Sequence, residues 1–148
     1  MKINAADILK KKKEPILVID LGDDVLEFNH FLYAQEKYVL LDKTYTRENK
    51  KLYKLQESLE KQVAENPTEE LEEKLDDINE KLRFVLFSQL APMCALTKEE
   101  LEDKLMEFTE DRYTAIALCR DIYEAYVIAV KEYDEDEKKG IKTLITKN

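Results

Sequence analysis

Two short apolar runs near the N-terminus predict a β-hairpin over residues 16–29. The first run, 16–19, is rich in β-branched side chains, and a second run, 25–28, follows a polar stretch. Gly22 and Asp23 suit the two central positions of a type II′ turn, because glycine adopts a positive φ without steric cost. The two runs therefore pair as antiparallel strands.

This turn also predicts the register of the strands. Leu17 lies opposite Phe28 and Ile19 opposite Leu26, so all four side chains share one face of the ribbon. A lone two-stranded ribbon is marginally stable in water. Its apolar face must therefore pack on a helix, or its edges must pair with another chain.

A long helix is predicted from about residue 31 to 65, a stretch that contains neither Gly nor Pro. Two threonines flank Tyr45 and lower the helix propensity, which leaves a break near 42–47 open. Spacings of three and four residues place one apolar row on a single face: Leu52, Leu55, Leu59 and Val63.

A second helix is predicted to begin at 66–69, with Asn66 as its N-cap and Pro67 in the first helical position. Pro92 is expected to end it. The short joint between the two helices requires an antiparallel helical hairpin. Its second seam has the narrow spacing of a coiled coil and consists of Leu71, Leu75, Ile78, Leu82 and Val85.

Capping residues mark two further helices. Thr97 and Glu100 have the spacing of a capping box, and Thr109 is expected to cap the helix that follows. This last helix, about 110–134, is apolar around most of its circumference, which is typical of a helix that is central or lies at a subunit interface. Gly140 is expected to interrupt the chain beyond it.

The pattern as a whole predicts a mainly α fold, with an antiparallel helical hairpin, further helices and a small N-terminal β-hairpin. Residues 1–14 form an amphipathic and basic segment. Residues 15–134 form a single helical domain. Residues 135–148 form an acidic tail whose order the pattern leaves open.

The net charge of the chain disfavours some classes of function. The formal net charge of −9 arises from the second half of the chain, which disfavours nucleic-acid binding because phosphate backbones are repelled. No apolar run approaches the roughly 18 residues of a membrane span, and the N-terminus has no signal-peptide core. We therefore expect a cytoplasmic protein that binds neither nucleic acid nor membrane, with Cys94 and Cys119 reduced.

No motif with catalytic, cofactor-binding or metal-binding spacing is found. His30 is the single histidine, and a capping or hydrogen-bonding role at the junction of strand and helix is the simpler reading. Cys94 and Cys119 lie among apolar neighbours, which is typical of inert buried thiols. Residues 19–23 are similar to the first phosphate loop of actin-like and sugar-kinase ATPases, but Asp23 and Asp24 would place negative charge where the phosphate binds. We expect no enzyme and no cofactor.

Two groups of apolar side chains are instead expected to meet other polypeptides. One is the apolar face of the predicted hairpin, and the other lies on the long C-terminal helix. Tyrosine combines a large apolar area with a polar hydroxyl. The tyrosines of the C-terminal helix therefore suit either a core or an interface. The candidate interaction residues are Leu17, Ile19, Leu26, Phe28, Tyr123, Tyr126, Val127 and Val130.

The order of these parts carries a resemblance to a known family. An amphipathic lead-in, 1–9, is followed by a lysine run, the two extended runs at 15–20 and 25–28, and a helical remainder that ends in an acidic tail. This architecture resembles the tail assembly chaperones of long-tailed phages and prophages of Gram-positive bacteria. The resemblance rests on the order of elements over most of the chain.

The resemblance implies a small acidic protein of the host cytoplasm, without catalytic activity. Such chaperones self-associate, coat the aggregation-prone tape measure protein and help recruit tail tube protein. The main alternative is a small cytoplasmic adaptor or inhibitor that binds one host or phage partner. A third class, an enzyme with a carboxylate metal site, requires stoichiometric metal in the purified protein.

Overall fold

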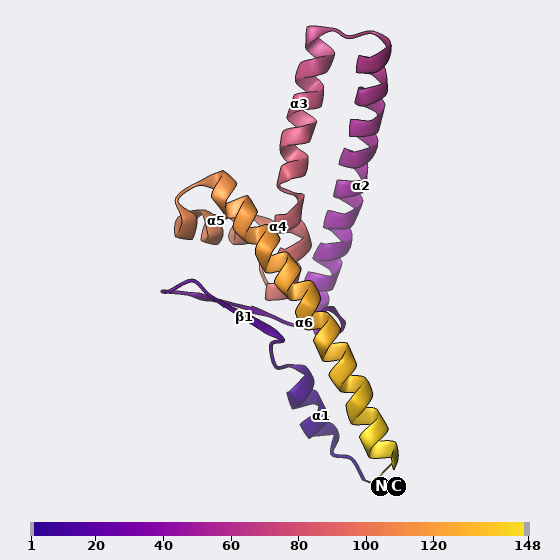
Figure 1. The fold of residues 1–148 in the computed structure, drawn as a ribbon, viewed down its shortest axis with the longest axis vertical. Coiled ribbons are helices and arrows are strands. Elements are labelled where there is room, and N and C mark those ends of the chain that lie inside the picture. Colours follow the sequence, from indigo (N-terminus) through magenta and orange to yellow (C-terminus); the bar gives the residue numbers. More distant parts are fainter. Residues whose placement is uncertain (1, 147–148) are drawn as a thin grey trace.

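A computed structural model describes residues 2–146, and the side chains of residues 2–140 (Figure 1). The fold is mainly α-helical, with one two-stranded antiparallel sheet, as predicted. In chain order the elements are α1 (Ala5–Lys12), β1 (Leu17–Asp20), β2 (Val25–Phe28), η1 (Phe31–Tyr33), α2 (Glu36–Glu65), α3 (Glu69–Arg83), α4 (Val85–Leu90), η2 (Ala91–Cys94), α5 (Lys98–Thr109) and α6 (Arg112–Thr146).

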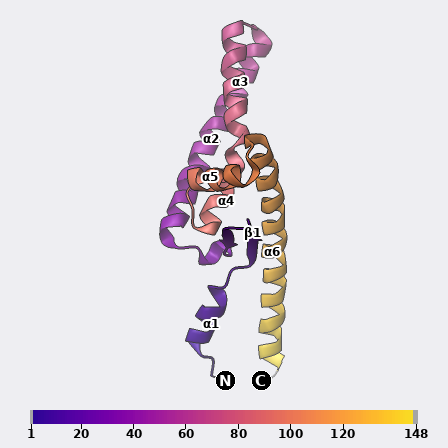
Figure 2. The ribbon, with the colours of Figure 1, turned by 90° about the vertical axis from the view of Figure 1, so that its left-hand side faces the viewer.

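The molecule is elongated. The α2–α3 hairpin projects to one end, while α1 and the C-terminal third of α6 lie at the other (Figures 1 and 2). Between them is the core, where the β-hairpin meets α4, η2, α5 and the first part of α6. Its buried apolar side chains include Leu26, Phe28, Phe87, Leu90, Leu101, Leu105, Ala115, Cys119 and Ile122.

The β-hairpin has the predicted register. Leu17 pairs with Phe28 and Ile19 with Leu26, and the inner side chains are buried or half-buried while those between them are exposed. Gly22 at the turn has a φ of +89°, and its N–H donates to Asp20 Oδ1 at 2.8 Å. The apolar face therefore packs on helices of the same chain, which was the first of the two alternatives.

The α2–α3 hairpin forms as predicted, but with differences in detail. Helix α2 is continuous through 42–47, and Thr44 Oγ1 donates to the carbonyl of Leu40 instead of breaking the helix. Leu55 lies outside the seam and is exposed. Its neighbour Gln56 lies inside and donates to Asn79 Oδ1 of α3 at 2.8 Å, so a polar pair joins the two helices midway.

The start of α3 differs from the prediction. Asn66 is the C-cap of α2, and the N-cap of α3 is Thr68, whose side chain accepts the N–H of Leu71 at 3.2 Å. The second helix was also predicted to run on to Pro92. It ends at Arg83, and a turn at Phe84 redirects the chain so that Val85 and the rest of α4 enter the core.

The capping box is present in full. Thr97 Oγ1 accepts the N–H of Glu100 at 3.2 Å, and the Glu100 carboxylate accepts the N–H of Thr97 at 3.1 Å. The predicted cap at Thr109 is wrong, because its hydroxyl donates to the carbonyl of Leu105 at the end of α5. Asp111 takes the capping role, since its carboxylate accepts the N–H of Thr114 at 3.0 Å.

Helix α6 is longer than predicted. It continues through the acidic residues 134–137 and through Gly140 to Thr146, so the segment from 135 to 146 is helical. Gly140 carries no left-handed backbone and nothing lies within 4 Å of a Cβ built on it. A single glycine lowers helix propensity by only about 1 kcal/mol, which the flanking helix formers offset.

Candidate functional site

His30 links the N-terminal elements to the far end of α6. Its side chain is only 1% exposed, and Nδ1 accepts the N–H of Leu32 at 3.2 Å. Because a backbone N–H can only donate, Nε2 must carry the ring hydrogen, and it donates to Asp134 Oδ1 at 3.0 Å. Both ring nitrogens are therefore engaged, which supports the capping role and leaves no lone pair free for proton transfer or metal binding.

Aromatic rings surround this imidazole. The His30 ring stacks on Phe31 at 4.4 Å between centroids and contacts Tyr133 at 5.1 Å, and Tyr133 meets the edge of Tyr33 at 6.3 Å. Burial, and then a hydrogen bond from its hydroxyl to Glu137, raise the pKa of Tyr133. The cluster thus joins η1 to α6 through packing as well as hydrogen bonds.

Lys12 connects α1 to the same cluster. Its ammonium donates to the hydroxyl of Tyr33 at 2.7 Å and lies 4.8 Å from the centre of that ring. The hydrogen bond to Tyr33 raises the pKa of Lys12. Apart from this side chain, α1 has little to hold it, because none of its residues is buried.

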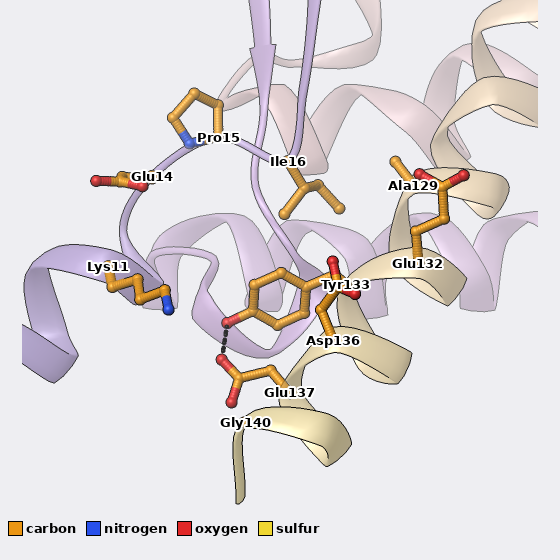
Figure 3. A pocket seen from close by; sticks show the side chains of 10 residues that line it. All are labelled: Lys11, Glu14, Pro15, Ile16, Ala129, Glu132, Tyr133, Asp136, Glu137 and Gly140. Carbon is orange, nitrogen blue, oxygen red and sulfur yellow. Dashed lines mark hydrogen bonds between the residues drawn. The ribbon is translucent and has the colours of Figure 1, made fainter. Parts of the chain in front are cut away.

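A groove of about 390 Å³ separates α1 and the following turn from α6 (Figure 3). We call it the α1–α6 groove. Its apolar lining comes from Pro15, Ile16 and Ala129 and from the ring of Tyr133. Acidic side chains dominate the polar lining: Glu132, Asp136 and Glu137 lie on α6, and Glu14 and Lys11 lie on the N-terminal side.

Several apolar side chains of the N-terminal elements are exposed. On and just before α1 these are Ile3, Ile8 and Leu9, and on η1 they are Phe31 and Leu32, which is 67% exposed. Helices of soluble proteins normally turn such side chains towards a core. These side chains are candidates for contact with another polypeptide.

The eight predicted interaction residues lie elsewhere, and mostly inside. Leu26, Phe28 and Tyr126 are buried in the core, which corrects the expectation that they face a partner. The Tyr126 hydroxyl donates to the carbonyl of Asn29 at 2.9 Å, and burial raises the pKa of Tyr126 to about 12. The choice left open for this tyrosine is thus resolved in favour of core packing.

The other five differ in exposure. Four are half-buried against the core: Leu17, Ile19, Tyr123 and Val130. Val127 is 49% exposed, and the next residue on α6, Ile128, is 59% exposed. Of the predicted set, Val127 alone is largely open to solvent, and its contact with a partner stays a prediction.

The sequence did not single out the groove residues, although one signal was present. The segment 3–9 was recognised as amphipathic, yet no neighbouring element of the chain was assigned to cover it. The other wall lies more than 110 residues later on α6, partly in the predicted helix, with Ala129, Glu132 and Tyr133, and partly in the segment expected to be a tail, with Asp136 and Glu137. No local pattern related Glu132 or Asp136 to α1.

The two cysteines are buried and free, as expected for structural thiols. Burial raises the pKa of Cys94 and of Cys119 to about 12, so both stay protonated at neutral pH and react slowly. Within the described residues, no group of three or more His, Cys, Asp or Glu side chains has the arrangement of a metal site.

Among the residues that the structure describes, no helix is both long enough and apolar enough to cross a membrane. Comparisons with models of protein families, with curated proteins and with solved structures find no match to this chain.

Proposed function

We propose that this protein is a non-enzymatic assembly chaperone that self-associates and holds an extended helical client. In the phage tail system that its architecture resembles, the client is the tape measure protein, the tail tube protein is recruited later, and the site of action is the host cytoplasm. The observation that carries the proposal is the apolar surface of α1 and η1, which the folded chain leaves uncovered.

Charge supports the same proposal. A holding protein must bind apolar surface and still keep the complex in solution. Here acidic side chains outnumber basic ones along α3 and at residues 132–137 of α6, while exposed apolar side chains are found on α1 and η1. Repulsion between acidic surfaces limits further aggregation once a client is bound.

Co-expression with a long, aggregation-prone helical client such as a tape measure protein tests the proposal. We expect the chain to raise the soluble fraction of the client several-fold. The double variant Ile8→Ser/Leu9→Ser should lose most of this effect. Because both side chains are exposed, its circular dichroism spectrum and unfolding midpoint should match those of the unaltered chain.

A matched control is Tyr53→Ser/Leu55→Ser, which removes two exposed apolar side chains from α2, on the projecting hairpin. It should leave client solubility unchanged. If the client stays insoluble with a folded, unaltered chain, the proposal is wrong. A strictly monomeric chain that captures one compact partner would support the adaptor or inhibitor instead.

A further inference from the structure

The basic segment before the β-hairpin has charges and apolar side chains without partners. Lys10, Lys11, Lys12 and Lys13 are consecutive, and Asp7 is the one acidic residue between Lys2 and Lys13. Among the described residues, Lys10, Lys11 and Lys13 form no ion pair. Ile8 and Leu9 are 40% and 57% exposed, so within its own chain α1 uses the charge of Lys12, which donates to Tyr33, and leaves its other lysines and its apolar side uncovered.

The α6 side of the α1–α6 groove has the opposite character. Five of the six residues at 132–137 are acidic. Asp134 is engaged by His30 and Glu137 by Tyr133, but Glu132 and Asp136 form no ion pair within the described part of the chain. Both line the groove, beside the apolar lining of Ile16 and Ala129.

We propose that the α1–α6 groove receives α1 of a second copy of this chain. In this arrangement Ile8 and Leu9 of one copy pack on the apolar lining of the other, and Lys10 and Lys11 face Glu132 and Asp136. The contact is reciprocal, so two copies related by a two-fold axis each insert one α1. The inference rests on the self-association in the proposed function and names the surfaces that perform it.

The second copy is favoured because this chain itself carries a helix that complements the groove. Its own α1 already forms one wall, through Lys11, and is held there by the bond from Lys12 to Tyr33. In that position its apolar side chains remain exposed and the groove remains open. A second α1 would cover both surfaces and pair the unused charges.

Charge reversal tests this arrangement on the purified chain without any client. The variant Lys10→Glu/Lys11→Glu places like charges in the contact, as does Glu132→Lys/Asp136→Lys. In low salt, sedimentation should show that each variant raises the dissociation constant of the dimer about tenfold or more, since four attractions become repulsions. The unaltered dimer should weaken as salt is added.

Mixing the two variants gives the decisive result. In a mixed dimer both contacts join opposite charges, so equimolar mixing should restore association to near that of the unaltered chain. A contact within one chain cannot be restored in this way. The combined four-site variant should also associate, because each of its contacts is again complementary.

Matched controls reverse the same number of charges elsewhere. Lys50→Glu/Lys51→Glu on α2 and Glu73→Lys/Asp76→Lys on α3 alter exposed side chains outside the groove. The α3 pair should leave association unchanged, and the α2 pair should weaken it only slightly, because it adds to the net negative charge. A wild-type chain that is monomeric at about 100 μM overturns the inference, as does association that groove reversals do not change.

Three further outcomes can be distinguished. If each variant dissociates but the mixture does not recover, α1 and the groove do not face each other and the proposed contact is wrong. If association follows the charge rules but no client is solubilised, the contact stands and the chaperone function fails. If a client basic helix is captured by a monomeric chain, the groove binds the client and the second copy is excluded.

Discussion

The β-hairpin and α1 are both short amphipathic elements of the N-terminal region, but they differ in burial. The inner face of the hairpin is covered by helices, and Phe28 is fully buried. Helix α1 buries none of its eight residues. Since burial of apolar area is the main stabilising term in folding, the hairpin contributes to stability and α1 contributes little. The difference leaves the apolar side of α1 available for the contact between copies that we propose.

Replacement of Phe28 should therefore have the largest effect. The Phe28→Ala variant leaves a cavity beside Tyr126, whose ring centroid lies 6.0 Å from that of Phe28. We expect the free energy of unfolding in urea to fall by about 3–5 kcal/mol. The paired variant Leu9→Ala should change it by less than about 0.5 kcal/mol. Similar losses in the two variants would contradict the contrast between hairpin and α1.

Loss of the hydrogen bond between His30 and Asp134 of α6 should have the second-largest effect on the free energy of unfolding. In Asp134→Ala the buried Nε2–H loses its acceptor, and we expect a loss of about 1–3 kcal/mol in the free energy of unfolding. Asp134→Asn keeps an oxygen at this position and should lose less than half as much. Equal stability of all three proteins would show that water replaces the carboxylate without cost.

Low pH should lower the free energy of unfolding by a smaller amount, because it protonates the carboxylates that cap two helices. The hydrogen bond from the Thr97 N–H lowers the pKa of Glu100, and bonds from Thr114 lower the pKa of Asp111. A depressed pKa means that the folded state binds fewer protons, so the stabilisation is present above the unfolded pKa, about 4. It is lost as pH falls through the folded value.

Unfolding in urea at pH 7 and pH 3 checks this prediction. Glu100→Gln and Asp111→Asn retain hydrogen-bonding side chains but do not titrate there, so their stability should fall less than that of the unaltered chain. Because both carboxylates are exposed, salt should reduce the difference. An identical acid dependence in the variants would exclude the two caps as its source.

Replacement of Gly140 should have the smallest effect on stability. Since nothing lies within 4 Å of a Cβ at this position, Gly140→Ala should stabilise the end of α6 by about 0.5–1 kcal/mol. Amide exchange near residue 140 is the appropriate measurement, because helix ends open locally. Gly22→Ala should instead destabilise the hairpin, as the φ of +89° at Gly22 strains any side chain. Faster exchange in Gly140→Ala would show that α6 ends before this residue.

Local rules predicted much of the fold and little of the site. The capping box at Thr97 and Glu100 and the hairpin register depend on residues close in sequence, where few alternatives compete. The break at Phe84 was missed because the apolar spacing continues across it, and the core decides which helix follows. The bond between His30 and Asp134 joins residues 104 positions apart, and no local pattern indicates it.

The amino-acid sequence by itself determined the kinds of elements, their order and the amphipathic character of each, because propensity, capping and periodicity act over a few residues. Only the tertiary structure decided which apolar faces are covered. Burial depends on which surfaces meet in space, so the face of Phe28 became core while Ile8 and Leu9 stayed in solvent beside an acidic groove.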